Sequence, residues 1–423
     1  MKQLDVSIEI RGEELFAGCI KGEGAADACF CYAGEYLCDD RAAPISVHLP
    51  LREEPFTPQE TKTFFDGLLP EGFTRRSVAG FLRTSEEDYL SILAGLGSEC
   101  LGAIRITGED TRRTAAAYQR ISKKRIRQLA GEGATESAQM VVEARLSLTG
   151  ASGKAGLYYD GKKHVWYLPS GDAPSTHIVK QSHVRLEHIV TNEQLVMRAA
   201  SKLGSEVPDS FIIDIGKGGD GEVLFACKRY DRDVMSERLV DGLPCPYRRH
   251  QEDVAQALGI PASAKYEEEG THYFKRTADL IRSCCADPIT DLRRLWDITV
   301  FNRLVGNTDN HIKNLSLLYT PDLKAIRLAP AYDLLSTIVY PASTRNMAFH
   351  IGGTYRLDDI DREAFRRAAA DIGIGRALAL ERFDVMTERM PQALSEAADE
   401  LAGNGFHRAG MIAERILSHF FGK

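Results

Sequence analysis

The chain has 423 residues, of which 43% are hydrophobic and 27% are charged, and its formal net charge is −7 at neutral pH. This length exceeds what one hydrophobic core organises, so we expect two or three subdomains. The negative balance argues against a protein that grips nucleic acid over a wide surface, although a local basic patch or a DNA-binding partner stays compatible with it. No run of 18 apolar residues occurs, so we expect no membrane partner.

The nine cysteines include no CxxC pair and no histidine at zinc-finger spacing. The first six residues alternate in polarity like a strand and lack the apolar core of a signal peptide. These features favour a cytoplasmic protein with reduced thiols.

Residues 1–108 are predicted to form a small α/β subdomain. A helix is expected to begin at Thr57-Pro58, because Thr suits the N-cap, Pro the first turn, and Glu60 completes a capping box. Alternating polarity predicts the strands, and apolar periodicity the further helices. The strands are expected at 5–10, 14–20, 28–32 and 102–106, and the further helices at 73–82 and 86–94.

Residues 109–140 are polar and are predicted to form a linker. A short helix is expected over 122–130, with basic side chains at Lys123, Lys124, Arg125 and Arg127. Such a run is usually a solvated face; the alternative is a docking surface for an acidic protein or nucleic acid.

Residues 141–235 have the pattern of a nucleotide-binding β-rich lobe, with strands expected at 145–148, 155–159, 164–168, 176–180, 210–215 and 223–230. The turn Gly150-Ala151-Ser152-Gly153-Lys154 could lie over phosphates, because glycines let backbone N–H groups approach anions and Lys154 adds charge. The turn matches neither a Walker A sequence nor a kinase glycine-rich loop, so its specificity is low.

Lys180 ends an apolar strand, and Glu193 follows at the start of an amphipathic helix. This order matches the kinase arrangement in which a strand lysine holds the α- and β-phosphates and a helix glutamate pairs with it. The alternative for Lys180 is an ordinary surface lysine. The main chain of Cys227, Lys228 and Arg229 leaves the β-rich lobe where a kinase hinge meets adenine.

Residues 236–423 are predicted to be a mainly α-helical lobe that carries the catalytic loop. A β-hairpin is expected at 315–319 and 325–328. Helices are expected at 251–258, 277–285, 291–305, 362–371, 376–390, 391–402 and 407–420.

The motif with the clearest chemistry lies between an expected helix and an expected strand. Asp309 and Asn314 stand five residues apart, which is the spacing of a kinase catalytic loop, and Asp333 follows nineteen residues later, where a kinase keeps its second metal ligand. Asp309 would accept the proton of a Ser or Thr hydroxyl, and Asn314 and Asp333 would bind Mg²⁺. His311 and Lys313 could contact or brace the γ-phosphate. The alternative is a polar turn capped by Asp and Asn.

Together these features predict an α+β, protein-kinase-like fold of two lobes. The sequence also resembles a known family. The segment from Gly306 to Asn314 resembles the catalytic loop of HipA-type kinases, the toxin half of bacterial HipBA modules. Five further blocks match the family in order: Phe65-Asp66-Gly67-Leu68-Leu69-Pro70, Thr176 to Lys180, Asn192-Glu193, Arg229 to Arg232 and Gln251 to Gly259. Tyr332-Asp333 stands in the place of the kinase DFG motif.

The resemblance implies a Ser/Thr protein kinase that uses ATP and Mg²⁺. Family members phosphorylate aminoacyl-tRNA synthetases and so arrest growth, and they pair with a helix-turn-helix antitoxin (HipB-like) that binds operator DNA. The family's self-phosphorylated serine would correspond to Ser147, with Thr149 second. A phosphate there would add negative charge where ATP phosphates must sit.

The sequence departs from the family at Ala151-Ser152-Gly153, where a hydrophobic residue, Gln and Pro or Glu are usual. This departure could alter ATP affinity and self-regulation. Two other classes of function remain open: a catalytically weak kinase fold that acts as an antitoxin-bound co-repressor, and a small-molecule or lipid phosphotransferase.

Overall fold

The computed structural model describes residues 2–108, 115–144 without 133, 153–182, 186–216, 223–234 and 237–421. The chain divides into two compact units, each assembled from three segments. The first unit holds 1–181, 226–262 and 318–326, and the second holds 182–225, 263–317 and 327–423. The strands β10 (Val223–Lys228), β16 (Ser316–Tyr319) and β17 (Ile326–Leu328) each contribute to both units.

The first unit begins with an antiparallel sheet of order β3-β2-β1-β4, which confirms the predicted strands. Its strands are β1 (Lys2–Ile10), β2 (Glu13–Gly22), β3 (Cys29–Tyr32) and β4 (Ile104–Gly108). Arg11 and Gly12 both have positive φ, as a two-residue hairpin turn requires. The helices are α1 (Gly34–Leu37), α2 (Pro58–Asp66), α3 (Gly72–Leu82) and α4 (Tyr89–Leu96). The predicted capping box of α2 is present, with Thr57 and Glu60 exchanging hydrogen bonds.

A second sheet has the order β5-β7-β6-β8-β10-β9. Its other strands are β5 (Ala117–Arg120), β6 (Lys154–Asp160), β7 (Val165–Ser170), β8 (His177–Gln181) and, in the second unit, β9 (Ser210–Asp214). The described part of the expected linker holds β5, α5 (Lys123–Glu132) and α6 (Ala134–Glu143). The helix α6 packs against α3 and β6 and buries Ala138, Met140 and Val141. These three residues are therefore part of the core of the unit.

Short elements complete the first unit. Two-residue strands pair as β11 with β14 and as β12 with β13, and β15 lies beside β16 in a three-stranded sheet. Their bounds are β11 (Arg232–Asp233), β12 (Leu239–Val240), β13 (Leu243–Pro244), β14 (Tyr247–Arg248), β15 (Gln251–Asp253) and α8 (Val254–Ala257).

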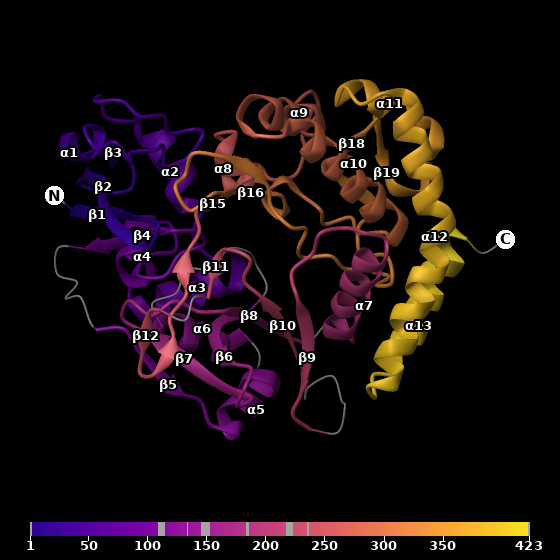
Figure 1. Ribbon diagram of the computed structural model, residues 1–423, viewed down its shortest axis with the longest axis horizontal. Helices are drawn as coiled ribbons and strands as arrows, with labels where there is room; N and C mark the ends of the chain where they lie inside the picture. Colours follow the sequence, from indigo (N-terminus) through magenta and orange to yellow (C-terminus); the bar gives the residue numbers. More distant parts are fainter. Residues whose placement is uncertain are drawn as a thin grey trace. The chain divides into compact units, whose positions relative to one another are not determined.

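The second unit is mainly helical, as predicted. The long helix α12 runs beside α7, α10, α11 and α13 (yellow to orange in Figure 1, with α7 in magenta). Trp296 and Phe365 lie fully buried with their rings edge to face. The elements are α7 (Ile189–Lys202), α9 (Tyr273–Cys284), α10 (Pro288–Val305), β18 (Asn346–Ile351), β19 (Thr354–Arg356), α11 (Arg362–Asp371), α12 (Arg376–Gly403) and α13 (Arg408–Phe420).

Two sequence-based expectations were wrong. The predicted helix at 251–258 starts three residues later, because Asp253 accepts from the N–H of Gln256 at 2.8 Å and caps α8, while 251–253 form β15. The predicted helices 376–390 and 391–402 are one helix, with Pro391 inside it. An interior proline costs about 3 kcal/mol, and the burial of Met390 and Leu394 offsets this cost.

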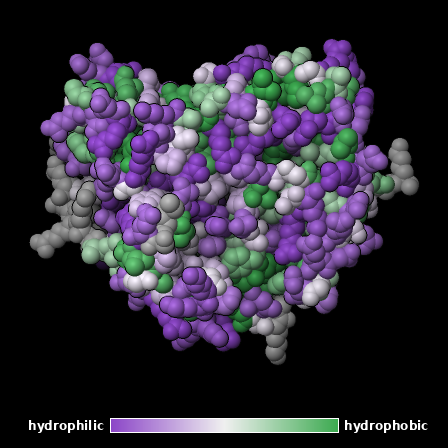
Figure 2. Space-filling view, viewed as in Figure 1, coloured by the Kyte–Doolittle hydropathy of each residue, from purple (hydrophilic) through white to green (hydrophobic). Residues whose placement is uncertain are grey.

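Polar side chains cover much of the face shown in Figure 2, and apolar side chains lie there in separate patches. Within the described residues, no helix is both long enough and apolar enough to cross a membrane.

Candidate active site

The predicted catalytic segment follows α10 directly. Gly306 ends this helix with φ +69°, and a Cβ there would lie 2.4 Å from the side chain of Ile338. Both features favour glycine at this position. The chain then forms a polar loop, a 3₁₀ turn over Ile312–Asn314 (η3), and β16. The motif therefore lies on a short loop between two regular elements, as predicted.

The main chain of this loop holds Asn314 beside Asp309. The carbonyl oxygen of Asp309 accepts from the N–H of His311 at 2.8 Å and from the amide nitrogen of Asn314 at 2.9 Å. Because the amide nitrogen is engaged, the oxygen is the atom of the Asn314 side chain that can bind a cation. Asn314 also lines a cavity of about 240 Å³ in the second unit.

Asp333 has a left-handed backbone, with φ +57°. Aspartate adopts this region more readily than most side chains, and other non-glycine residues of the described chain, Arg11 among them, share it. The side chain of Asp333 is half-buried, and that of Asp309 is exposed. Both carboxylates belong to the second unit.

One buried amide connects the segments of both acidic residues. Asn307 is fully buried, and its Oδ1 accepts from the N–H of Asp309 at 3.1 Å. Its Nδ2 donates to Oδ1 of Asn302 at 2.8 Å and, more weakly, to the carbonyl of Asp333 at 3.5 Å. The contact between Asn307 and Asp333 could not be predicted from sequence, because these two residues are 26 positions apart along the chain.

A second set of hydrogen bonds fixes the chain after Asp333. The hydroxyl oxygen of Thr337 accepts from the N–H of Thr308 at 2.9 Å and donates to the carbonyl of Gly306 at 2.9 Å. Asn192 of α7 makes two hydrogen bonds to the main chain of Ser336. Its Oδ1 accepts from the N–H at 3.0 Å, and its Nδ2 donates to the carbonyl at 2.8 Å. Since Asn192 precedes Glu193, these bonds join the helix of Glu193 to the segment of Asp333.

Tyr266 reaches the predicted catalytic carboxylate from another loop. Its hydroxyl donates to Oδ1 of Asp309 at 2.5 Å, and its ring meets the ring of His311 edge to face, with centroids 5.3 Å apart. His311 and Lys313 are both buried. The sequence carried no signal for Tyr266, which lies 43 residues before Asp309.

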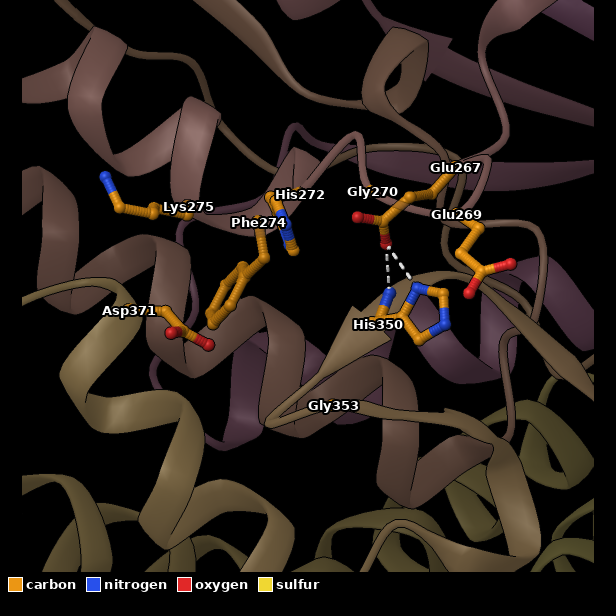
Figure 3. A pocket seen from close by; sticks show the side chains of 9 residues that line it. All are labelled: Glu267, Glu269, Gly270, His272, Phe274, Lys275, His350, Gly353 and Asp371. Carbon is orange, nitrogen blue, oxygen red and sulfur yellow. Dashed lines mark hydrogen bonds and ion pairs between the residues drawn. The ribbon is translucent and has the colours of Figure 1, made fainter.

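The loop of Tyr266 is held at its next residue, Glu267. The carboxylate of Glu267 accepts from the N–H of Tyr273 at 2.9 Å, from Nδ1 of His350 at 3.0 Å, and from the N–H of His350. Figure 3 shows Glu267 and His350 joined in this way at the edge of a cavity of about 210 Å³. The segment that presents Tyr266 is therefore fixed by hydrogen bonds to the buried carboxylate of Glu267.

The predicted nucleotide-binding lysines lie in the first unit. Lys154 of β6 and Lys180 of β8 are direct cross-strand partners, so their side chains leave the same face of the sheet. Gly153 approaches Gln181 so closely that a Cβ would lie 1.9 Å from its amide nitrogen. Gly150, Ala151, Ser152, Ser147 and Thr149 lie outside the described residues. Glu193 is buried in the second unit, and its pairing with Lys180 stays a prediction.

The predicted hinge divides into two parts. Cys227 is half-buried and Lys228 exposed, whereas Arg229 is buried and its N–H donates to the carbonyl of Thr176 at 2.9 Å. The guanidinium of Arg229 pairs with Glu99 at 3.1 Å and Asp231 at 2.8 Å. The N–H and the guanidinium of Arg229 are thus engaged within the first unit, and the contact of the main chain of Cys227, Lys228 and Arg229 with adenine stays a prediction.

The described residues contain no group of three or more His, Cys, Asp or Glu side chains placed to hold a metal ion. The candidate magnesium ligands are instead one amide oxygen and one carboxylate. This set suits Mg²⁺, which prefers oxygen and usually keeps waters and substrate phosphates as its other ligands.

The fold is α+β and protein-kinase-like, with a β-rich part and a mainly helical part. The chain belongs to the HipA family: residues 146–394 match the HipA-like C-terminal domain, and residues 8–107 match the HipA N-terminal domain.

Curated relatives and a solved structure agree with this assignment. The putative kinase Y4mE of Sinorhizobium fredii is 34% identical over 88% of this chain and 87% of its own. The Serine/threonine-protein kinase toxin HipA of Shewanella oneidensis is 27% identical over 92% of this chain and 89% of its own. The solved HipA, HipB and operator DNA complex of Shewanella oneidensis matches with a TM-score of 0.78 at 23% identity, covering 99% of this chain and 97% of that one.

Proposed function

We propose that this protein is an ATP- and Mg²⁺-dependent serine/threonine protein kinase of the HipA toxin type. The observation that supports it most is the set of hydrogen bonds that links the main chains of Asp309 and Asp333 through the Asn307 amide and the Asn314 amide to the carbonyl of Asp309. Phosphoryl transfer depends on positioning and charge neutralisation more than on covalent chemistry, so a rigid set of this kind is what the reaction needs.

In this proposal Asp309 orients the substrate hydroxyl and accepts its proton. Asn314 and Asp333 hold Mg²⁺, which would neutralise charge on the phosphates. Lys180 and Lys154 supply positive charge to the phosphates, with the main chain of Gly150 to Gly153 beside them. His311 and Lys313 brace the γ-phosphate, Glu193 pairs with Lys180, and the main chain of Cys227, Lys228 and Arg229 meets adenine.

The partners that we propose for this chain are taken from those of its relatives. The solved Shewanella oneidensis complex contains HipB and operator DNA, which supports a helix-turn-helix antitoxin for this chain. The substrate proposed is a translation factor such as an aminoacyl-tRNA synthetase, whose phosphorylation would arrest growth. Self-phosphorylation at Ser147, or at Thr149, would add negative charge at the phosphate site and inactivate the kinase.

The experiment is transfer of labelled phosphate from ATP to protein in a bacterial lysate. We expect labelled protein with the wild type and none with Asp309→Asn or Asp333→Ala, while Asp384→Asn, a change at an exposed carboxylate of α12, keeps full activity. Labelling that survives Asp309→Asn and Asp333→Ala would refute the roles proposed for these two carboxylates. Tight ATP binding without any transfer would favour an antitoxin-bound co-repressor, and label confined to small molecules would favour a small-molecule phosphotransferase.

A further inference from the structure

Resting on the proposed kinase function, we propose that Tyr266 is a positioning residue that fixes the orientation of the Asp309 carboxylate for the incoming substrate hydroxyl. The contact that carries this proposal is the hydrogen bond of 2.5 Å from the Tyr266 hydroxyl to Oδ1 of Asp309. A carboxylate has two oxygens that can each accept hydrogen bonds. A fixed donor bonded to one oxygen restricts rotation about the Cβ–Cγ bond and so sets the direction in which the second oxygen points.

Asp309 is exposed, so burial does not fix the orientation of its carboxylate. A buried carboxylate is held by its surroundings, whereas an exposed one samples several rotamers. The main chain of Asp309 is fixed by Asn307 and Asn314, but those bonds involve its N–H and its carbonyl. The bond from Tyr266 acts on the carboxylate itself.

Tyr266 is held on both sides, so it can restrain its partner. The carbonyl of Ala264 accepts from the hydroxyl of Tyr273 at 2.6 Å, and the N–H of Glu267 donates to the carbonyl of Ala348 at 2.8 Å. The ring of Tyr266 meets that of His311 edge to face. The hydroxyl is therefore delivered by a fixed segment, although 43% of the residue remains exposed.

The first test separates the hydroxyl from the ring. Tyr266→Phe keeps the ring contact with His311 and removes the donor. We expect kcat for protein phosphorylation to fall about tenfold, as the loss of one orienting hydrogen bond predicts, with KM for ATP unchanged. The matched control is Tyr355→Phe, a tyrosine of the same unit whose ring stacks on His350, and we expect full activity from it.

Two results would overturn the proposal. An unchanged kcat would mean that Asp309 is oriented without Tyr266. A higher kcat, or a lower KM for the protein substrate, would mean that Tyr266 blocks the acceptor position.

A second measurement does not depend on turnover, so it distinguishes this proposal from the proposed function. Tyr266→Phe is expected to lower the melting temperature when Asp309 is present and to have no effect in the Asp309→Ala background. An equal loss in both backgrounds would show that the hydroxyl is not coupled to the carboxylate. If wild-type enzyme transferred no phosphate but this coupling held, the kinase assignment would fail while the Tyr266–Asp309 contact stood.

Discussion

At the scale of single residues, the site depends on amides and hydroxyls whose partners are distant in the sequence. Asp309, Asn314 and Asp333 were selected from the sequence because kinase chemistry fixes the types of such residues and their order along the chain, and their roles stay predictions. The contacts of Asn307 with Asp333, of Asn192 with Ser336 and of Tyr266 with Asp309 could not be predicted, because each joins segments that only the folded chain brings together. Local spacing predicts which groups react, and tertiary contacts decide how they are held.

Asn307→Ala is predicted to reduce kcat about 100-fold, because a misplacement of about 1 Å at a reacting group has an effect of this size. The change removes the bonds to the N–H of Asp309 and the carbonyl of Asp333 together. Steady-state phosphorylation assays check it, with Asn404→Ala at the exposed end of α12 as the control. A kcat within twofold of the wild type would contradict the positioning role of Asn307.

Glu252 is predicted to make stability depend on pH. Burial raises the pKa of Glu252 from its usual 4.5 to about 7. Ser46 and Tyr319 donate hydrogen bonds to its carboxylate, which lower the pKa, but burial has the larger effect. The folded state therefore holds the proton more tightly than the unfolded state. This tighter proton binding adds about 3 kcal/mol to the free energy of unfolding below pH 4.5, and the contribution is lost as the pH rises towards 7.

Urea denaturation of the wild type and Glu252→Gln at a series of pH values between 4.5 and 8 measures this contribution as a difference. Burial also lowers the pKa of the neighbouring His250 to about 4, but His250 is present in both proteins and cancels. The difference in free energy of unfolding between the wild type and Glu252→Gln should become smaller as the pH rises. A difference that stays constant with pH would contradict the raised pKa.

At the scale of secondary-structure elements, the structure agrees with the sequence-based predictions wherever local side chains determine where a helix begins or ends. The capping box at Thr57 and the end of α10 at Gly306 lie where they were expected. The errors arose where packing overrides propensity. Pro391 predicts a helix end, but α12 continues through it because its buried side chains pack on α7 and α13.

Pro391→Ala is predicted to stabilise the protein by about 1–3 kcal/mol, because alanine restores a backbone donor inside α12 and removes the ring clash. Thermal and urea denaturation measure the change. Ser395→Ala, at an exposed position one turn later in the same helix, is expected to have little effect. Lower stability of the Pro391→Ala protein would show that the proline is favourable in its site.

At the scale of the whole molecule, both units are assembled from segments far apart in the chain. Each domain predicted from sequence, with boundaries at 108, 140 and 235, is one continuous segment. Such domains cannot describe a unit that the chain leaves and later re-enters. A buried ion cluster joins such segments in the first unit. Glu99 lies between Arg229, Arg232 and Arg248, and these arginines hold the pKa of its carboxyl at about 2 despite burial.

Glu99→Gln is predicted to destabilise the first unit by about 3–5 kcal/mol, because three buried guanidinium groups would lose one of their counter-charges. Urea denaturation followed by tryptophan fluorescence and circular dichroism measures the loss. Glu87→Gln, at an exposed position, serves as the control. A loss below about 1 kcal/mol would mean that water or neighbouring carboxylates compensate for the missing charge.

The central claim is that Asn314 and Asp333 hold one magnesium ion for phosphoryl transfer beside Asp309. The rate of phosphate transfer as a function of Mg²⁺ concentration tests it most directly, in the wild type, Asn314→Ala and Asp333→Ala. We predict that Asn314→Ala needs at least tenfold more Mg²⁺ for its half-maximal rate and that Asp333→Ala loses several orders of magnitude at any Mg²⁺ concentration. Mg²⁺ dependence and rates equal to those of the wild type in both variants would contradict the account.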